Sequence, residues 1–173
     1  MEPSVGRIML PGVLPRTADT DAFWEAFRRH TGLDRDDYAV GSFGDNAEMA
    51  SELADLVIAG TKRATASLAR DYGEGREPMP KPGDFVMMLD GAGCPRFIWR
   101  TTEVTIKPLV EVDEAFAWDE GEGDRTRKWW LDAHRRYFAR QALRNGFELN
   151  DGVLTVFERF ELVWPLDIAD YDS

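Results

Sequence analysis

The segment from Asp45 to Leu68 constrains the fold of this chain more than any other stretch. Between residues 45 and 59, apolar side chains recur at the three- and four-residue spacing of an amphipathic helix, at Met49, Leu53, Leu56 and Val57. Gly60 is the predicted end of this helix, because glycine readily adopts the left-handed conformation that closes helices. Residues 65–68 are expected to form a strand, so the chain turns from helix to strand at one fixed point.

Lys62 and Thr65 follow this turn directly, and two interpretations of them are open. In the structural interpretation, Lys62 neutralises the negative end of the helix dipole and Thr65 fills a strand position. In the functional interpretation, the turn holds both side chains at the edge of a site. Local pattern alone is compatible with either.

The rest of the sequence predicts strands and helices that do not alternate regularly. Helices are expected at residues 21–30, 111–117 and 125–143, and strands at residues 84–90, 96–106 and 153–163. The first two of these strands are expected to form a hairpin around the turn Asp90–Gly93, and the Gly- and Pro-rich residues 70–82 an exposed loop bordering a cleft. This order does not suit a doubly wound parallel sheet and favours an α+β domain around a small curved sheet or barrel.

Length and composition indicate one compact domain, since 173 residues with 43% hydrophobic content can build a real core. We predict an N-terminal lead-in and helix over residues 1–40, a main domain over 41–165 and a C-terminal tail over 166–173. No apolar run is long enough for a membrane span and no secretion signal is recognisable, so a soluble, cytoplasmic protein is expected. Cys94 is the single cysteine, which excludes an intramolecular disulfide and argues against a thiolate metal cluster.

Charge is unevenly distributed along a chain whose net charge is −11. That total argues against broad attraction to nucleic acid, which needs a positive field. Residues 111–124 hold seven carboxylates and no basic residue, whereas the next twenty residues are rich in arginine. A local cationic surface can therefore exist, and a short or small nucleic-acid ligand is compatible with the sequence.

The acidic stretch from Asp119 to Asp124 contains two glycines and immediately precedes the long predicted helix. Asp124 is expected to cap that helix, and the remaining acids form either a solvated loop or part of a site. Their spacing matches no established metal-binding loop, so we predict no metal. On the helix, Trp130 and His134 fall on one face, where they either pack in the core or line a base-stacking pocket.

Several of these motifs together resemble bacterial ASCH-domain proteins, in family order across residues 41–165. They are residues 60–67 (GTKRATAS), residues 100–104 (RTTEV), residues 116–125 (FAWDEGEGDR), the helix with Trp130 and His134, and residues 157–161 (FERFE). The resemblance implies a PUA-like fold, a compact β-barrel flanked by helices, related to modules that bind RNA.

The resemblance also implies candidate chemistry, because the family includes an amidohydrolase that deacetylates N4-acetylcytidine. Its functional lysine and threonine match Lys62 and Thr65, and its glutamate matches Glu120, with Glu122 as a rival. Where that enzyme has an arginine two residues after its threonine, this chain has Ser67. In such a site a buried lysine of lowered pKa would activate the threonine hydroxyl, and Glu120 would supply a proton to the departing amine.

Two other functions remain open at this stage. The family also includes a ribonuclease acting on single-stranded RNA, in which Lys62 would stabilise the phosphate, Thr65 and Ser67 would bind its oxygens, and His134 or an acid would move protons. A noncatalytic module that binds RNA or a modified nucleoside is the third. We predict a metal-independent hydrolase without a cofactor, acting on a modified nucleoside in preference to single-stranded RNA. The catalytic residues are Lys62, Thr65 and Glu120, and the substrate-binding residues are Ser67, Arg63, Glu122, Trp130 and His134.

Overall fold

The computed structural model describes residues 14–170, so most of the predicted N-terminal lead-in lies outside the described residues. Its helices are α1 (Ala18–Thr31), α2 (Ala47–Ile58), α3 (Glu114–Glu120) and α4 (Arg127–Asn145). Its strands are β1 (Ala39–Ser42), β2 (Ala64–Leu68), β3 (Phe85–Leu89), β4 (Pro95–Pro108) and β5 (Leu154–Trp164). The predicted helices and strands are therefore present, whereas the proposed division into three units stays a prediction.

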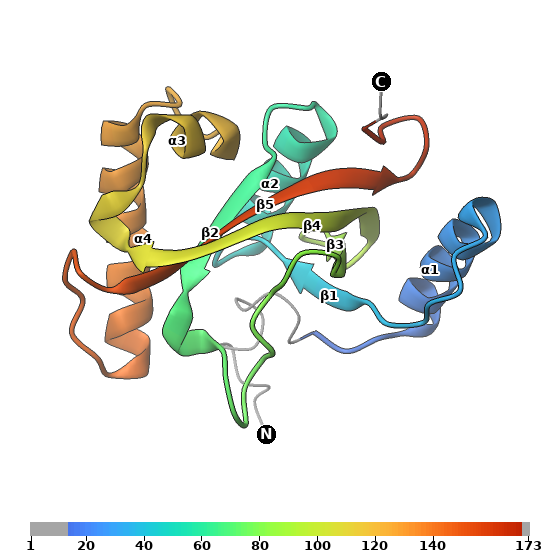
Figure 1. Cartoon of the computed structure of the whole chain (residues 1–173), viewed down its shortest axis with the longest axis horizontal. Coiled ribbons are helices and arrows are strands. Elements are labelled where there is room, and N and C mark those ends of the chain that lie inside the picture. Colours follow the sequence, from blue (N-terminus) through green and yellow to red (C-terminus); the bar gives the residue numbers. More distant parts are fainter. Residues whose placement is uncertain (1–13, 171–173) are drawn as a thin grey trace.

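The strands form one curled, five-stranded sheet in the order β1-β3-β4-β5-β2 (Figure 1). Only β1 and β3 are parallel, and β3 and β4 form the predicted hairpin. The long strands β4 and β5 run antiparallel through the middle of the sheet, with register shifts that help the sheet to bend. This arrangement confirms the expected α+β organisation.

Apolar side chains on both faces of β3 fix two of the helices. Met87 packs with Trp24 and Phe27 of α1 on one face, whereas Val86 and its neighbours pack against α2 on the other. This two-sided burial explains why residues 85–89 form a continuous apolar run rather than an alternating one.

The helices α3 and α4 cover the end of the sheet formed by β2 and β5. Phe157 of β5 meets Phe116 of α3 edge to face, with ring centroids 4.9 Å apart, and Trp130 of α4 at 5.9 Å. Packing at this end brings the acidic segment after α3 against the turn before β2. The site residues come from the end of α3 and the acidic segment after it, from the turn and β2, and from α4.

The helix boundaries differ from the sequence prediction by up to about three residues, and capping explains two of the differences. The short helix begins at Glu114 instead of Glu111, because Asp113 caps it by accepting a hydrogen bond from the amide of Phe116. Thr126, not Asp124, caps α4. Asp124 instead accepts hydrogen bonds from the amide and the hydroxyl of Thr126. It therefore does not cap α4 itself but orients the threonine that does.

Candidate active site

The turn between α2 and β2 presents Lys62 as the sequence predicts. Gly60 has a φ of +88°, and the amides of Thr61 and Lys62 both donate to the carbonyl of Leu56, at 3.0 and 3.2 Å. The backbone therefore leaves α2 in a closed turn instead of continuing the helix. The Lys62 side chain is directed inward and is 1% exposed.

Two carboxylates surround the Lys62 ammonium. Its Nζ lies 3.0 Å from Oε1 of Glu120 and 3.0 Å from Oε2 of Glu122. It also lies 5.3 Å from the centre of the Phe43 ring, whose face attracts a cation. The sequence left open whether Glu120 or Glu122 is the carboxylate partner of Lys62. In the structure, both of them form an ion pair with it.

The acidic segment reaches Lys62 because its backbone lies directly against the turn. Gly121 has a φ of +70°, and a Cβ atom there would lie 2.4 Å from the carbonyl oxygen of Thr61, closer than any real contact allows. The amide of Arg63 donates to the carbonyl of Asp119 at 2.7 Å, and Arg159 forms an ion pair with the Asp119 side chain. These contacts fix both glutamates relative to Lys62.

The second oxygen of Glu120 connects this ion pair to α4. Oε2 accepts a hydrogen bond from the Trp130 indole and lies 3.0 Å from Nε2 of His134. The His134 ring stacks on Trp130 at a centroid distance of 3.8 Å, and its Nδ1 lies 2.9 Å from the Trp130 carbonyl oxygen one helical turn earlier. One buried carboxylate therefore lies between a lysine and a histidine.

The charges within this cluster follow from its contacts. The two glutamates raise the pKa of Lys62 despite its burial, so the lysine is an ammonium. Lys62 and His134 likewise hold the pKa of Glu120 below its ordinary value, although burial opposes them. Glu120 and Glu122 raise the pKa of His134, and both of its ring nitrogens face acceptors, as an imidazolium requires.

These charges contradict part of the expected chemistry. A lysine of lowered pKa and a glutamate able to donate a proton were predicted, but in this arrangement Lys62 is protonated and Glu120 is ionised. The sequence indicated burial of the lysine without the number of carboxylates around it. His134, which carries the transferable proton beside Glu120, is the better proton donor.

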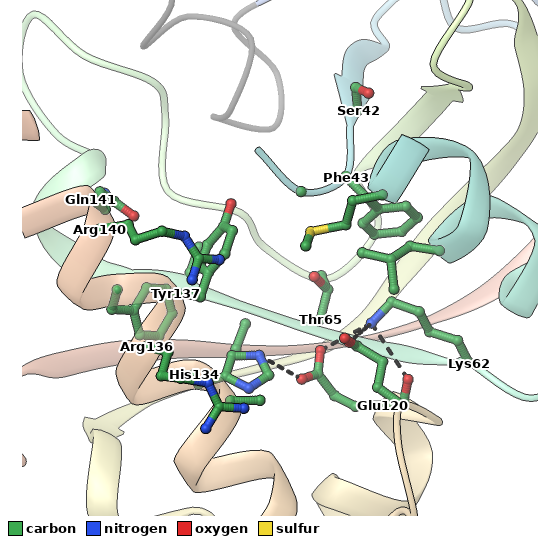
Figure 2. A pocket seen from close by; sticks show the side chains of 18 of the residues that line it. Ser42, Phe43, Lys62, Thr65, Glu120, His134, Arg136, Tyr137, Arg140 and Gln141 are labelled. Carbon is green, nitrogen blue, oxygen red and sulfur yellow. Dashed lines mark hydrogen bonds and ion pairs between the residues drawn. The ribbon is translucent and has the colours of Figure 1, made fainter. Parts of the chain in front are cut away.

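The cluster lies in the wall of a cavity of about 280 Å³ between α2, β2 and α4 (Figure 2). Thr65 and Ser67 of β2 also line this cavity. No hydrogen bond from another residue in the range 14–170 involves the Thr65 hydroxyl, whereas the Ser67 hydroxyl lies 2.6 Å from that of Tyr72. Lys62, Thr65, Ser67, Glu120, Glu122 and His134 are therefore brought together as the sequence predicts.

Two predicted substrate-binding residues do not line the cavity. The guanidinium of Arg63 instead donates to the carbonyls of Val57 and Lys62 and forms an ion pair with Asp170. Trp130 is 1% exposed and packs in the core, so it positions Glu120 and His134. Its neighbour Trp129 lines the cavity in its place.

Other lining residues escaped the sequence analysis. Phe43 follows the end of β1, and no local pattern connects it to Lys62. Tyr137 and Gln141 carried a usable signal, since they lie three and seven residues after His134 and so share its helix face. Gln141 donates to both carboxylate oxygens of the buried Asp71, at 2.8 and 3.0 Å, which closes one side of the cavity.

Three groups of this cluster are of a kind that binds metals. Glu120, Glu122 and His134 can each offer one ligand atom, and these atoms lie within 4.8 Å of one another. The Lys62 ammonium, however, lies 3.0 Å from both carboxylates, which is where a cation would be held. Histidine must also lose its second proton to bind a metal. The donor set therefore suits an ammonium better than a divalent ion.

A curled sheet with one parallel edge pair, flanked by helices and holding a buried Lys–Glu–His cluster, defines an α+β protein of the PUA-like type. The chain belongs to the ASCH-domain family, because the sequence profile of the ASCH domain matches residues 39–164. The resemblance inferred from the motifs is thereby confirmed, and so is the predicted fold.

Two solved structures are similar to this chain over most of its length. One is a crystal structure of a protein from Enterococcus faecalis V583, with 34% identity, a TM-score of 0.76, and coverage of 84% of this chain and 92% of that one. The other is an ASCH domain from Lactobacillus crispatus JV V101, with 32% identity, a TM-score of 0.73, and coverage of 82% and 92%. A comparison with curated proteins gave no match. Within residues 14–170, no helix has the length and apolar character that crossing a bilayer requires.

Proposed function

We propose that this protein is a hydrolase that cleaves the amide of an acylated nucleoside, such as N4-acetylcytidine. The observation that carries the proposal is the depth of the charged cluster: Lys62 and Glu120 are each 1% exposed in the wall of a cavity of about 280 Å³. A cavity of this volume is at the small end for ligand sites and suits one nucleoside. An acyl group at the tip of a base can reach such a depth more readily than a phosphate flanked by nucleotides.

The walls and the charges suit this substrate. Phe43, Trp129 and Tyr137 offer aromatic surface to a base. The Thr65 hydroxyl is the nucleophile best placed for an acyl carbon, because no described residue engages it in a hydrogen bond. The Lys62 ammonium and the His134 imidazolium supply positive charge beside the acyl oxygen and the leaving nitrogen.

The lysine becomes a base when the substrate enters. Glu122 is the less buried of its two carboxylates, with a side chain 19% exposed, so it is the one that a ligand can displace. As Glu122 leaves with the ammonium proton, burial lowers the pKa of Lys62 and the neutral amine accepts the proton of Thr65. The threonine oxygen bonds to the acyl carbon, the carbon–nitrogen bond breaks, and His134 protonates the departing amine.

Hydrolysis of the acylated threonine completes the cycle. A water molecule attacks the ester carbon and gives a proton to the neutral His134. Lys62 returns its proton to the threonine oxygen as the carboxylic acid departs. Glu122 then returns to Lys62 and gives back the ammonium proton that it took at the start, so Lys62, Glu122 and His134 all regain their starting charges and no cofactor is required.

Cleavage of single-stranded RNA is the second candidate, supported by Arg136 at the cavity mouth. Its side chain is exposed, lines the cavity, and forms no ion pair with any residue in the range 14–170. An exposed guanidinium near an imidazolium is suited to a phosphate. We rank this function second, because the negative charge of Glu120 and Glu122 next to Lys62 repels a phosphodiester.

The deciding experiment compares the wild type with Thr65→Val and with the control Thr105→Val, a matched substitution on the exposed side of β4. Each protein receives N4-acetylcytidine in one assay and single-stranded RNA in another. We expect deacetylation by the wild type and the control, reduced at least about 10³-fold in Thr65→Val. RNA cleavage without deacetylation would favour the ribonuclease, and binding without turnover of either substrate a noncatalytic module.

A further inference from the structure

A second cavity, of about 210 Å³, adjoins the Lys62 cavity, and a wall of side chains separates the two. Three contacts mark this wall. Thr65 and Glu158 are paired across β2 and β5, so their side chains share one face of the sheet. The hydroxyls of Ser67 and Tyr72 lie 2.6 Å apart, and the Phe43 ring lies 5.8 Å from Trp99. In each pair the first residue lines the Lys62 cavity and the second lines this one.

The polar group in this second cavity is the carboxyl of Glu158, which is 4% exposed. Its Oε2 accepts a hydrogen bond from the Thr101 hydroxyl at 2.6 Å, and the Trp99 indole donates to that same hydroxyl at 3.3 Å. The Trp99 indole is also within hydrogen-bonding range of this carboxyl, and no cation among residues 14–170 forms an ion pair with it. The partners of Glu158 are therefore neutral groups, and it lacks the cation that normally accompanies a buried acid.

The charged groups that line the cavity are engaged elsewhere. Arg16 donates to the carbonyls of Asp36 and Tyr38, and Lys81 pairs with Asp84. Burial and the nearby Asp84 together raise the pKa of Glu158 to about 7. Glu77 and Asp37 also line the cavity and add no positive charge, and Tyr72 stays neutral because burial raises its pKa.

The remaining walls are flat and apolar. Tyr38, Phe85 and Trp99 contribute aromatic surface, and the loop after β2 contributes Pro78 and Pro80. The volume suits a single ring system. A carboxylate at the base of such a slot is complementary to a ring edge that presents two neighbouring N–H groups, because its two oxygens accept them side by side.

We propose that this second cavity binds a planar heteroaromatic ring with two adjacent N–H donors, the chemistry of the guanine edge, and that Glu158 is its acceptor. The inference does not depend on the reaction in the Lys62 cavity. The ring can belong to a free nucleoside or to a base within single-stranded RNA, and these two sources share the same edge.

The test is isothermal titration calorimetry, which measures the affinity of the full chain for guanosine and for inosine. Inosine lacks the second N–H donor of the guanine edge. We expect guanosine to bind, inosine to bind about tenfold more weakly, and Glu158→Gln to weaken guanosine binding about tenfold or more. With a pKa of about 7, the ionised fraction of Glu158 falls about tenfold between pH 8 and pH 6, and the affinity for guanosine should follow it.

Three variants keep the outcomes distinct. Glu48→Gln, on the exposed surface of α2, is the matched control and should bind like the wild type. Thr65→Val should keep guanosine binding while deacetylation fails, and Glu158→Gln should keep its fold by circular dichroism. Single-stranded RNA with one guanine, compared with RNA without any, identifies the source of the ring. Three results would each overturn the proposal: no binding of either free guanosine or the guanine-containing RNA, equal affinity for guanosine and inosine, or unchanged guanosine affinity in Glu158→Gln.

Discussion

Glu120 and Glu158 are the same residue type, both nearly inaccessible to solvent, yet they differ in charge. Glu120 faces an ammonium and an imidazolium, which hold its pKa below the ordinary value. Glu158 faces the Thr101 hydroxyl and the Trp99 indole, and no cation among residues 14–170 pairs with it, so burial raises its pKa to about 7. Burial alone therefore does not determine the charge of a carboxyl group in this protein, because neighbouring cations reverse its effect at Glu120 and are lacking at Glu158.

The comparison separates two kinds of cavity. The Lys62 cavity contains both cationic and anionic side chains in direct contact, so protons can move among these groups without leaving the site. The Glu158 cavity holds one acid whose missing partner a ligand can supply.

Removing the lysine charge should have the largest effect. In Lys62→Met, Glu120 and Glu122 lose their common cation, and breaking a buried pair in this way costs about 3–5 kcal/mol of the free energy of unfolding. Urea denaturation at pH 7 measures the loss. Lys128→Met is the matched control, because the Lys128 side chain is 88% exposed and an ion pair this exposed contributes little to stability. Equal stability of Lys62→Met and the wild type would contradict the charge assignment.

The contributions of Glu158 and Glu120 to the free energy of unfolding should change with pH in opposite directions. The folded pKa of Glu158 is above its ordinary value of 4.5, so its stabilising contribution is complete below pH 4.5 and is lost as pH rises through about 7. Between pH 5 and pH 8, the wild type should lose up to about 3 kcal/mol more than Glu158→Gln. The lowered pKa of Glu120 acts the other way: its contribution is present above 4.5 and is lost as pH falls.

Urea denaturation of both proteins at several pH values isolates the contribution of Glu158 together with its coupling to Asp84, because the groups that do not interact with Glu158 titrate alike in the two chains. Glu48→Gln serves as the surface control. Parallel pH curves for the wild type and Glu158→Gln would mean that Glu158 is ionised throughout, and the comparison between the two glutamates would fail.

The residues of the Lys62 cavity can be predicted from the sequence better than those of the Glu158 cavity. Lys62 and Thr65 are fixed by a local signal, the helix that ends at Gly60 and continues into β2. Glu120 and Glu122 follow from the acidic, glycine-rich segment, but their simultaneous contact with one lysine depends on how α3 packs against the turn. Local patterns do not describe such packing, and for that reason the charge of Lys62 was predicted wrongly.

Glu158 carried a weaker signal that was not used. It alternates with Val156 and Phe160 along β5, which places an acid on an apolar face of a strand. That pattern indicates a buried carboxyl, whereas its neighbours Thr101 and Trp99 come from β4 and are specified only by the register of the sheet. Phe43 was missed for the same reason, because its contact with Lys62 joins two distant segments.

Removing the charge of Glu122 should have a smaller effect than removing that of Lys62. Glu122→Gln takes away one of the two carboxylates that raise the pKa of Lys62, so that pKa should fall while Glu120 still compensates the ammonium. If Lys62 must lose a proton before Thr65 reacts, the acidic limb of the kcat profile for deacetylation should move to lower pH. Glu111→Gln, an exposed acid of the same segment, should leave the profile in place. An acidic limb that stays or moves to higher pH would remove Glu122 from the proposed displacement.

Chelation should have the smallest effect on deacetylation, less than about twofold. The Lys62 ammonium already supplies the positive charge between Glu120 and Glu122, so a divalent ion could enter only by displacing it. Deacetylation is measured after dialysis against a chelator and again after addition of Zn²⁺, Mn²⁺ or Mg²⁺, with a zinc-dependent amidase as the control for chelation. Added Zn²⁺ should inhibit, since it competes with Lys62 for both carboxylates and with the proton for His134. Loss of activity on chelation, restored by one of these ions, would instead assign Glu120, Glu122 and His134 as metal ligands and reduce Lys62 to their counter-ion in the metal-free protein.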